Sequence, residues 1–200
     1  MTRLLLVRHG ETVDNINKIM QGQTHGRLTL NGIEQAHELG RQLRGEHIDV
    51  FLSSDLARAV ETLEIIKKDL KPTPNPSRGE GSLNTLSMET VSSEANQTPL
   101  PSGGVGGGLL LLRERDWGSF TGRYIPDLQN EVWPDDIETL DAMKARARRF
   151  LDFVRDNYPG KTVLAVGHGI INKAIQSVYY GKPMNEIQKM VNCEVRVLEL

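Results

Sequence analysis

The segment Leu4-Leu5-Leu6-Val7-Arg8-His9-Gly10 decides the fold, because a short apolar run ends there on an arginine, a histidine and a glycine. The segment Leu164-Ala165-Val166-Gly167-His168-Gly169 has the same form. Apolar runs of this length are typical of strands that are buried on both faces of a parallel sheet. We therefore predict two central strands that deliver His9 and His168 to one edge of the sheet.

The rest of the chain alternates between short apolar runs and helical patterns. Further strands are expected at residues 49–53 and 194–200, the last of them near a sheet edge. Apolar residues at spacings of three and four predict helices between the strands. These cover residues 30–43, 56–70 and 137–154, and another helix begins at Gly169. The order predicts a three-layer α/β/α fold around a mostly parallel sheet. The basic residues of the helix 137–154, Arg146 among them, are expected on its solvated face.

Composition sets the broad class. The 200 residues are 38% hydrophobic and 25% charged, with a net charge of -2, which is ordinary for a soluble globular protein. Nothing in this balance favours a nucleic-acid or membrane partner, and the apolar run near Met1 is too short for a signal peptide or a spanning helix. A single cysteine, Cys193, is compatible with a reducing compartment, so we expect a cytoplasmic protein. A homodimer stays open.

Residues 71–108 break the pattern of a single domain over 1–200. They are rich in Pro, Gly, Ser, Thr and Asn and have no periodicity, which predicts a largely disordered, low-complexity insertion. Residues 73–81 and 98–106 share the pattern T-P-x-P-S-x-G-x-G, which suggests a repetitive genetic element inserted into a surface loop. Loop-closure entropy grows slowly with length, so such an insertion is tolerated. The alternative is a lid or a partner-binding loop.

Arginines identify the ligand that this sheet edge would bind. Arg8 precedes His9, and a guanidinium forks onto phosphate or carboxylate but repels a metal cation. Neither histidine has the neighbours of a metal site, so we expect no metal. Arg58, in the first turn of its helix, would add a second phosphate clamp, or else pair with Glu61.

Asn15 could donate an amide hydrogen bond to the same anion. The helix that Gly169 opens favours negative charge at its N-terminus. Two unrelated buried histidines remain the simpler alternative.

Five motifs follow one another along the chain: Arg8-His9-Gly10-Glu11-Thr12-x-x-Asn15, Leu28-Thr29-x-x-Gly32-x-x-Gln35-Ala36, Ser53-Ser54-Asp55-Leu56-x-Arg58-Ala59, Leu112-Arg113-Glu114-Arg115-x-x-Gly118-x-x-x-Gly122 and Gly167-His168-Gly169. In this order they resemble the histidine phosphatase superfamily, the phosphoglycerate-mutase-like enzymes. The resemblance covers essentially the whole chain except residues 71–108. It implies a phosphomonoester hydrolase that needs no metal and no other cofactor.

The resemblance also implies a role for each matching residue. His9 would be the nucleophile, Glu114 would protonate the leaving oxygen, and the phosphoryl oxygens would be held by Arg8, Asn15, Arg58 and His168. A neutral imidazole attacks phosphorus, while two arginines and a protonated second histidine spread the charge of the transition state. Water then attacks the phosphohistidine.

Other assignments depend on the resemblance more heavily. Glu114 follows the apolar run 109–112, and without the family it would be a surface carboxylate at the end of a strand. Gln21 and Gly22, with the two residues after them, resemble the loop beside the substrate. Four aromatic residues after Glu114 would roof the site or pack in the core; they are Trp117, Phe120, Tyr124 and Trp133.

Two alternatives to a phosphatase stay open. The mutase subgroup has a tyrosine where this chain has Trp117 and a lysine where it has Ile125, and no Arg-Arg pair occurs here before Arg148. Fewer cations would hold a phosphoglycerate more weakly, so the phosphatase is favoured over a phosphoglycerate mutase. A non-catalytic phosphate-binding protein would result if the insertion displaced Glu114. The substrate is open among small phosphorylated metabolites such as α-ribazole phosphate, fructose 2,6-bisphosphate and phosphoglycerates.

Overall fold

A four-stranded sheet forms the centre of the computed structural model, which describes residues 1–70 and 109–200. Its strands, in the order β2-β3-β1-β4, are β1 (Arg3–Arg8), β2 (Val50–Ser53), β3 (Thr162–Gly167) and β4 (Val195–Glu199). β3 pairs in parallel with both β1 and β2, while β4 pairs antiparallel with β1 at the edge. The predicted, mostly parallel sheet is confirmed. The predicted insertion at 71–108, with its repeat, lies outside the described residues.

The two apolar runs form the central pair of strands. Residues 4–7 and 163–166 are at most 2% exposed, as continuous apolar runs require in the middle of a covered sheet. Their register pairs Leu4 with Val163 and Arg8 with Gly167. His9 and His168, each one residue further on, therefore leave the sheet side by side.

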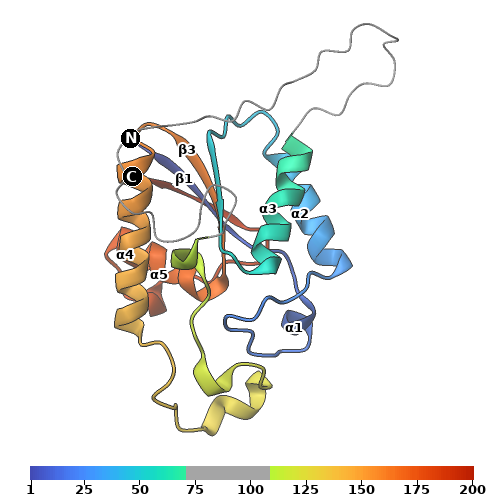
Figure 1. Cartoon of the computed structure of the whole chain (residues 1–200), viewed down its shortest axis with the longest axis vertical. Helices are drawn as coiled ribbons and strands as arrows, with labels where there is room; N and C mark the ends of the chain where they lie inside the picture. The colour runs from blue at the N-terminus through green and yellow to red at the C-terminus, as the bar shows by residue number, and fades with distance from the viewer. Residues whose placement is uncertain (71–108) are drawn as a thin grey trace, which may run out of the picture.

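Helices cover both faces of the sheet, as the sequence predicts. α2 (Leu30–Gln42) and α3 (Ala57–Leu70) lie on one side, and α4 (Leu140–Asn157) and α5 (Gly169–Tyr180) lie on the other (Figure 1). Successive residues of a strand point to opposite faces, so Leu4 and Leu6 pack on the side of α4 and α5, while Leu5 and Val7 pack on the side of α2 and α3. Burying each such side chain stabilises the fold by about 1.5–3 kcal/mol.

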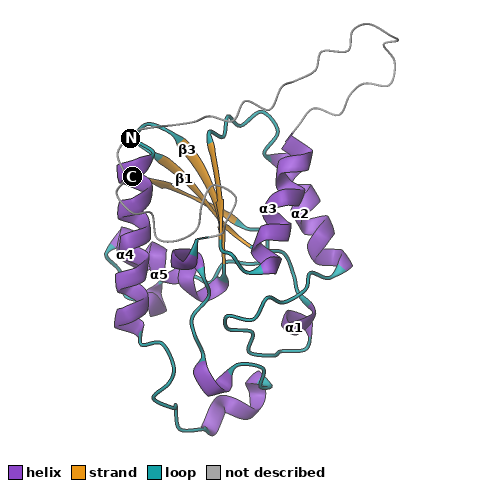
Figure 2. Ribbon diagram, in the orientation of Figure 1, coloured by secondary structure: helices purple, strands orange, loops and turns teal. Residues whose placement is uncertain are grey.

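Short turns connect these helices and strands. They are α1 (Val13–Ile16), η1 (Leu110–Leu112), η2 (Gly118–Phe120), η3 (Ile125–Asn130) and η4 (Met184–Glu186). In Figure 2 the stretch from η1 to α4 consists only of such turns and of loops. Within residues 1–70 and 109–200, no helix has both the length and the apolar composition needed to cross a membrane.

Two local predictions differ from the structure. The run 109–112 forms the 3-10 turn η1 instead of a strand, because only the amide of Leu109 reaches the end of β2, at the carbonyl of Ser53 (2.7 Å). α4 begins at Leu140, where the Thr139 hydroxyl accepts a hydrogen bond from the amide of Ala142, and not near Ile137. Ile137 is buried all the same, in a separate cluster with Phe120 and Leu128.

Candidate active site

Two buried histidines lie together at the carboxyl ends of β1 and β3. His9 is 3% exposed and His168 is fully buried, and their ring centroids are 5.1 Å apart. The backbone of His9 is fixed on both sides: its amide donates to the carbonyl of Gly167 (3.1 Å), and its carbonyl accepts from the side chain of Asn192 (2.9 Å). The sheet register therefore brings the two predicted histidines to one place.

The hydrogen bonds of His9 determine its tautomer. Nδ1 lies 2.7 Å from the carbonyl oxygen of Gly10, which can only accept, so Nδ1 carries the proton. Nε2 therefore has the free lone pair, and it accepts a hydrogen bond from Nε of Arg58 (3.3 Å). Nε2 is the ring atom that can act as a base or a nucleophile.

Burial and neighbouring cations keep both imidazoles neutral. Desolvation is the largest cause that lowers the pKa of His9 well below 6.5, and the charges of Arg58 and Arg8 lower it further. The pKa of His168 falls well below 6.5 for the same reasons, desolvation first and Arg58 next. The prediction of a protonated His168 concerns the site with a phosphoryl group bound, and it stays a prediction.

Arg8 and His168 offer buried hydrogen-bonding atoms that no residue in the described parts of the chain uses. Arg8 donates from Nη1 to the carbonyl of Met190 (2.7 Å), but its buried Nε has no partner among the described residues. The same is true of both ring nitrogens of His168. Desolvation is the largest cause that lowers the pKa of Arg8, and Glu114 partly offsets it. Since an unmet buried polar group costs about 1–3 kcal/mol, these atoms together mark a place built for a ligand.

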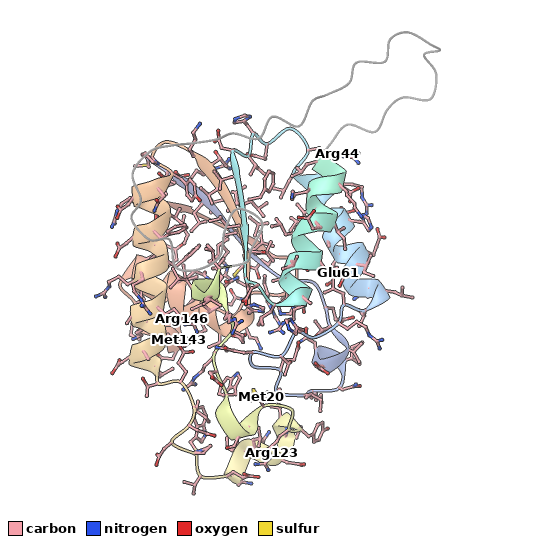
Figure 3. The ribbon with its side chains drawn as sticks, viewed as in Figure 1. Met20, Arg44, Glu61, Arg123, Met143 and Arg146 are labelled. Atoms are coloured by element: carbon pink, nitrogen blue, oxygen red, sulfur yellow. The ribbon has the colours of Figure 1, made fainter. Side chains whose placement is uncertain are left out.

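Arg58 also reaches the site, but most of its donors hold backbone. Its side chain is 1% exposed and donates to the carbonyls of Gly22 (2.9 Å), Thr24 and His25 (3.2 Å). A guanidinium has five N–H groups, so Nε–H, which meets His9, and one Nη2 hydrogen remain for an anion. Desolvation lowers the pKa of Arg58 to about 10. It forms no salt bridge with Glu61 or any other described residue, and Glu61 is exposed on α3 (Figure 3).

The predicted substrate loop lies next to Arg58. Gln21 is buried, donates from Nε2 to the Thr12 hydroxyl (2.7 Å), and leaves its buried Oε1 without a partner among the described residues. Gly22 has a positive φ of 51°, which lets its carbonyl turn toward Arg58. Gly26 adopts φ 67°, and a Cβ there would lie 2.9 Å from Oε1 of Gln21, so only glycine fits.

The side-chain oxygen of Asn15 accepts hydrogen bonds from the protein, whereas its side-chain Nδ2 group does not take part in them. In α1 it closes a capping box, in which its Oδ1 accepts from the amide of Thr12 (3.2 Å) and its own amide donates to the Thr12 hydroxyl. The side chain of Asn192 also donates to that Oδ1 (3.4 Å). With the oxygen used twice, the Nδ2 group is the end of the Asn15 side chain that can still donate, and its expected hydrogen bond to an anion stays a prediction.

Glu114 lies at the N-terminus of α5. Its Oε1 accepts from the amides of Arg115 (2.8 Å), Ile170 (3.1 Å) and Ile171 (3.1 Å), and its Oε2 accepts from Ile170 (3.1 Å). Its charge raises the pKa of Arg8, so the two groups are close. The first amides of α5, the helix that Gly169 opens, therefore donate to the carboxyl group of Glu114. The expected role of Gly169 toward an anionic ligand stays a prediction.

Three residues of the site were missed by the sequence analysis. Thr62 accepts from the amide of Gly10 (3.0 Å) and donates to the carbonyl of Arg58 (2.7 Å), which links the histidine turn to α3. Asn192 holds His9 and Asn15, as described above. Lys189 is near Gly169, where an added Cβ would lie 3.4 Å from its Cε and 3.6 Å from Nε of Arg8. Lys189 and Asn192 lie in a loop without periodicity, so no sequence signal marks them.

The predicted aromatic group surrounds another arginine. The guanidinium of Arg115, 6% exposed as a residue, lies 4.6 Å from the ring centroid of Trp117 and 5.1 Å from that of Trp133. Phe120 is buried, whereas Trp133 is 55% and Tyr124 is 44% exposed. Core packing therefore holds for Phe120 and in part for Trp117, which is half-buried and packs against the cluster of Phe120, Leu128 and Ile137.

Known proteins resemble this chain over nearly its full length. It is 29% identical over 197 residues to the uncharacterized phosphatase PhoE of Bacillus subtilis, covering 96% of this chain and 85% of that protein. It is 29% identical over 188 residues to the probable phosphoglycerate mutase GpmB of Yersinia enterocolitica, covering 92% and 77%.

A solved structure has the same fold. A phosphoserine phosphatase mutant of Entamoeba histolytica, in complex with phosphoserine, superposes with a TM-score of 0.71 at 23% identity and covers 98% of this chain and 90% of its own. The sequence profile of the histidine phosphatase superfamily (branch 1) matches residues 4–99 and 110–200. The resemblance drawn from the five motifs is thus confirmed, and the chain belongs to the histidine phosphatase superfamily, branch 1.

Proposed function

We propose that this protein hydrolyses small phosphomonoesters through a phosphohistidine formed on His9. The observation that carries the proposal is the set of buried hydrogen-bonding atoms on Arg8 and His168 that no described residue uses, together with the ring of His9, whose centroid is 5.1 Å from that of His168. A phosphoryl group supplies the acceptor oxygens that Arg8 lacks and an electrophilic phosphorus within reach of Nε2. The phosphatase name of a relative that is 29% identical supports the same chemistry.

In the first step, Nε2 of His9 forms a bond to phosphorus while the bond from phosphorus to the ester oxygen breaks. Arg58 moves its Nε–H from Nε2 to a phosphoryl oxygen, which frees the lone pair for attack. Arg8, Asn15 and His168 hold the other oxygens. Glu114 gives its proton to the departing ester oxygen, so an alcohol leaves rather than an alkoxide.

In the second step, water attacks the phosphohistidine. The Glu114 carboxylate takes a proton from that water as its oxygen bonds to phosphorus, and the bond between phosphorus and Nε2 breaks. Phosphate leaves, and His9 and Glu114 return to their starting states. Glu114 follows the insertion and accepts hydrogen bonds from the amides of Ile170 and Ile171, next to His168, which supports a catalytic protein over a non-catalytic one.

The test is phosphate release by the purified protein from a panel of phosphomonoesters, ranked by kcat/KM. We expect turnover, a phosphoryl-sized mass increase on His9 in rapidly quenched samples, and a loss of more than about 1,000-fold in kcat for His9→Ala. Activity that survives His9→Ala would exclude this mechanism.

A phosphoglycerate mutase is the second candidate function. Lys189 favours it, because this cation lies near Arg8 and adds a positive charge that could hold a phosphoglycerate. The two functions differ in the acceptor of the phosphoryl group, which is water in one and a sugar-acid oxygen in the other. A coupled assay in which phosphoglycerates interconvert faster than phosphate is released would favour the mutase.

We also propose that the protein works in the cytoplasm on a small-molecule phosphate ester, with neither a nucleic acid nor a membrane as partner. The single Cys193, the weak net charge and the resemblance to metabolic enzymes support this. Cell fractionation with a compartment marker tests the location, and sedimentation tests whether a homodimer forms.

A further inference from the structure

Glu114 belongs to a segment that has no helix or strand of its own. Residues 113–117 follow η1 and precede η2, so their carbonyl groups have no regular secondary structure to pair with. Arg146 makes three of the hydrogen bonds that this region accepts: it donates from Nη1 to the carbonyls of Leu111 (3.0 Å) and Arg113 (2.6 Å), and from Nη2 to that of Glu114 (3.4 Å). Nε2 of Gln23 also donates to the carbonyl of Glu114 (3.3 Å). The backbone that carries Glu114 is therefore held by a guanidinium from α4.

The sequence placed Arg146 on a solvated face, and the structure corrects this. Its side chain is only 11% exposed and points from α4 toward the segment of η1 and Glu114 (Figure 3). Arg148 and Arg149 of the same basic run are exposed. Periodicity assigns Arg146 to the polar side of an isolated helix. Periodicity within one helix does not show that an irregular segment, whose carbonyl groups need donors, packs against that side.

Glu138 fixes the orientation of Arg146. Its carboxylate accepts from Nε (2.9 Å) and Nη2 (2.7 Å) of Arg146, and its side chain is 15% exposed. Glu138 also holds the chain after Glu114, because its Oε2 accepts from the amide of Asp116 (3.2 Å) and its carbonyl accepts from Nε of Arg115 (2.8 Å). Together the pair holds the backbone on both sides of Glu114.

We propose that Arg146, oriented by Glu138, is a positioning residue that sets where the carboxyl group of Glu114 meets the leaving oxygen. This rests on the proposed function, in which Glu114 protonates that oxygen. The amides at the start of α5 hold the carboxylate, and Arg146 holds the backbone behind it, so the side chain is fixed at both ends. Small misplacements of a proton donor are costly, because general acid catalysis needs hydrogen-bond distance.

The chemistry of the leaving group gives this role its own signature. An alkyl phosphate such as β-glycerophosphate expels a strongly basic oxygen and needs the proton. 4-Nitrophenyl phosphate expels a stable anion and scarcely needs it. Loss of a correctly placed acid therefore lowers kcat/KM for the first substrate and spares the second, whereas general damage to the site lowers both. The ratio kcat/KM is the right measure, because hydrolysis of the phosphohistidine is common to both substrates.

The experiment compares Arg146→Lys with Glu114→Gln on both substrates, and uses Arg149→Lys as the matched control on the exposed side of α4. Lysine keeps the charge of Arg146 but loses the planar fork that holds Glu138 and three carbonyls at once. We expect Glu114→Gln to lower kcat/KM for β-glycerophosphate by about 100-fold or more, and Arg146→Lys by about 10-fold. Each change should cost less than about 3-fold with 4-nitrophenyl phosphate, and Arg149→Lys should change neither value by more than that.

The outcomes separate this inference from the proposed function. If Glu114→Gln lowers kcat/KM equally for the two substrates, Glu114 is not the acid and the proposed mechanism fails. If Glu114→Gln lowers kcat/KM for β-glycerophosphate alone while Arg146→Lys lowers it equally for both substrates or for neither, Glu114 is still the acid, and the positioning role of Arg146 is overturned. Thermal melting confirms that the variants are folded. Should Arg146→Lys melt below the assay temperature, Glu138→Gln takes its place, because it removes part of the fork and keeps the guanidinium, with the same two outcomes.

Discussion

Burial determines the protonation states of single residues at the site. His9 and His168 are neutral because the interior opposes charge and because Arg8 and Arg58 are buried next to them. The site therefore holds its positive charge on guanidiniums, which stay protonated, and its nucleophilic lone pair on an imidazole that is ready to attack. A phosphate that enters this site meets fixed donors, so little reorganisation is needed at the moment of reaction.

The lowered histidine pKa values predict that the fold weakens in mild acid. In the unfolded chain His9 and His168 take up protons near pH 6.5, but in the native state they do so only at a much lower pH. The unfolded state then binds more protons, and the free energy of unfolding falls as pH falls below about 6.5, by at most about 1.4 kcal/mol per pH unit for each histidine.

Urea denaturation at about pH 7.5, 6.5 and 5.5 measures this dependence. The variant His168→Asn removes one titrating group, so its free energy of unfolding should fall less steeply between about pH 6.5 and 5.5 than that of the unchanged protein. Equal slopes for the two proteins would show that His168 is not a source of the acid sensitivity.

Lys189 is predicted to strengthen substrate binding rather than the chemical step. It lies beside Arg8 and Gly169 and forms no salt bridge with another described residue. Its pKa is lowered by burial first and by Arg8 next. We expect Lys189→Gln to raise KM by about 3- to 10-fold and to change kcat by less than about 2-fold.

The control for Lys189→Gln is Lys182→Gln, which removes the same charge from an exposed position just after α5. Steady-state kinetics at low and high salt provide the measurement, because the difference in KM should shrink as salt screens the charge. A similar rise in KM for both variants would mean that only net charge matters.

At the scale of elements, the turn after β1 is fixed by its close approach to α2. A Cβ on Gly32 would lie 2.0 Å from the carbonyl oxygen of Glu11, and a Cβ on Gly10 would lie 2.5 Å from that of Gly32. Only glycines allow the turn that carries His9 to pack this closely on the start of α2.

The variant Gly32→Ala is therefore predicted to weaken the fold and the activity together. The clash should lower the free energy of unfolding by about 1–3 kcal/mol, even though alanine favours a helix over glycine. It should also lower kcat/KM, because the turn must shift beneath His9. Leu30→Ala, at a position that is 87% exposed in the same turn of α2, should change stability by less than about 0.5 kcal/mol. An unchanged kcat/KM in Gly32→Ala would refute the link between this contact and the site.

Elements were predictable from the sequence where local pattern and burial agree. The apolar runs at 4–7 and 163–166 are uninterrupted, so as strands they can be buried on both faces only in the centre of the sheet. Their register then brings His9 and His168 together. The run 109–112 is equally apolar, yet it has only one hydrogen bond to β2, and a sequence does not report such pairing.

Side chains that act across elements were not predictable. Arg146 has the position of a solvated residue in its helix and becomes buried only because the segment of Glu114 crosses it. Asn192 and Lys189 approach the site from a loop whose path depends on how β4 pairs with β1. Such contacts need the tertiary structure, since they satisfy groups that lie far away in the sequence.

For the whole molecule, the candidate site collects segments from both halves of the chain. The turn after β1, the loop at 21–26 and the first turn of α3 come before the predicted insertion, and Glu114, His168 and the loop at 189–193 come after it. The two halves meet through the central pairing of β1 with β3. Folding of this shared sheet therefore assembles the site, and residues 71–108 are predicted to contribute nothing to it.

Replacing residues 73–106 by about eight Gly and Ser residues tests this prediction. Shortening the connection between α3 and Leu109 about threefold lowers the entropy cost of closing it and should raise the free energy of unfolding by about 1 kcal/mol. The proposed catalytic residues all lie in the described parts, so kcat/KM should stay within about 3-fold of that of the full chain. A second variant, in which residues 73–106 are scrambled at constant length and composition, separates the sequence of the segment from its length. Loss of activity in both variants, with thermal melting unchanged, would mean that the segment has a specific role at the site.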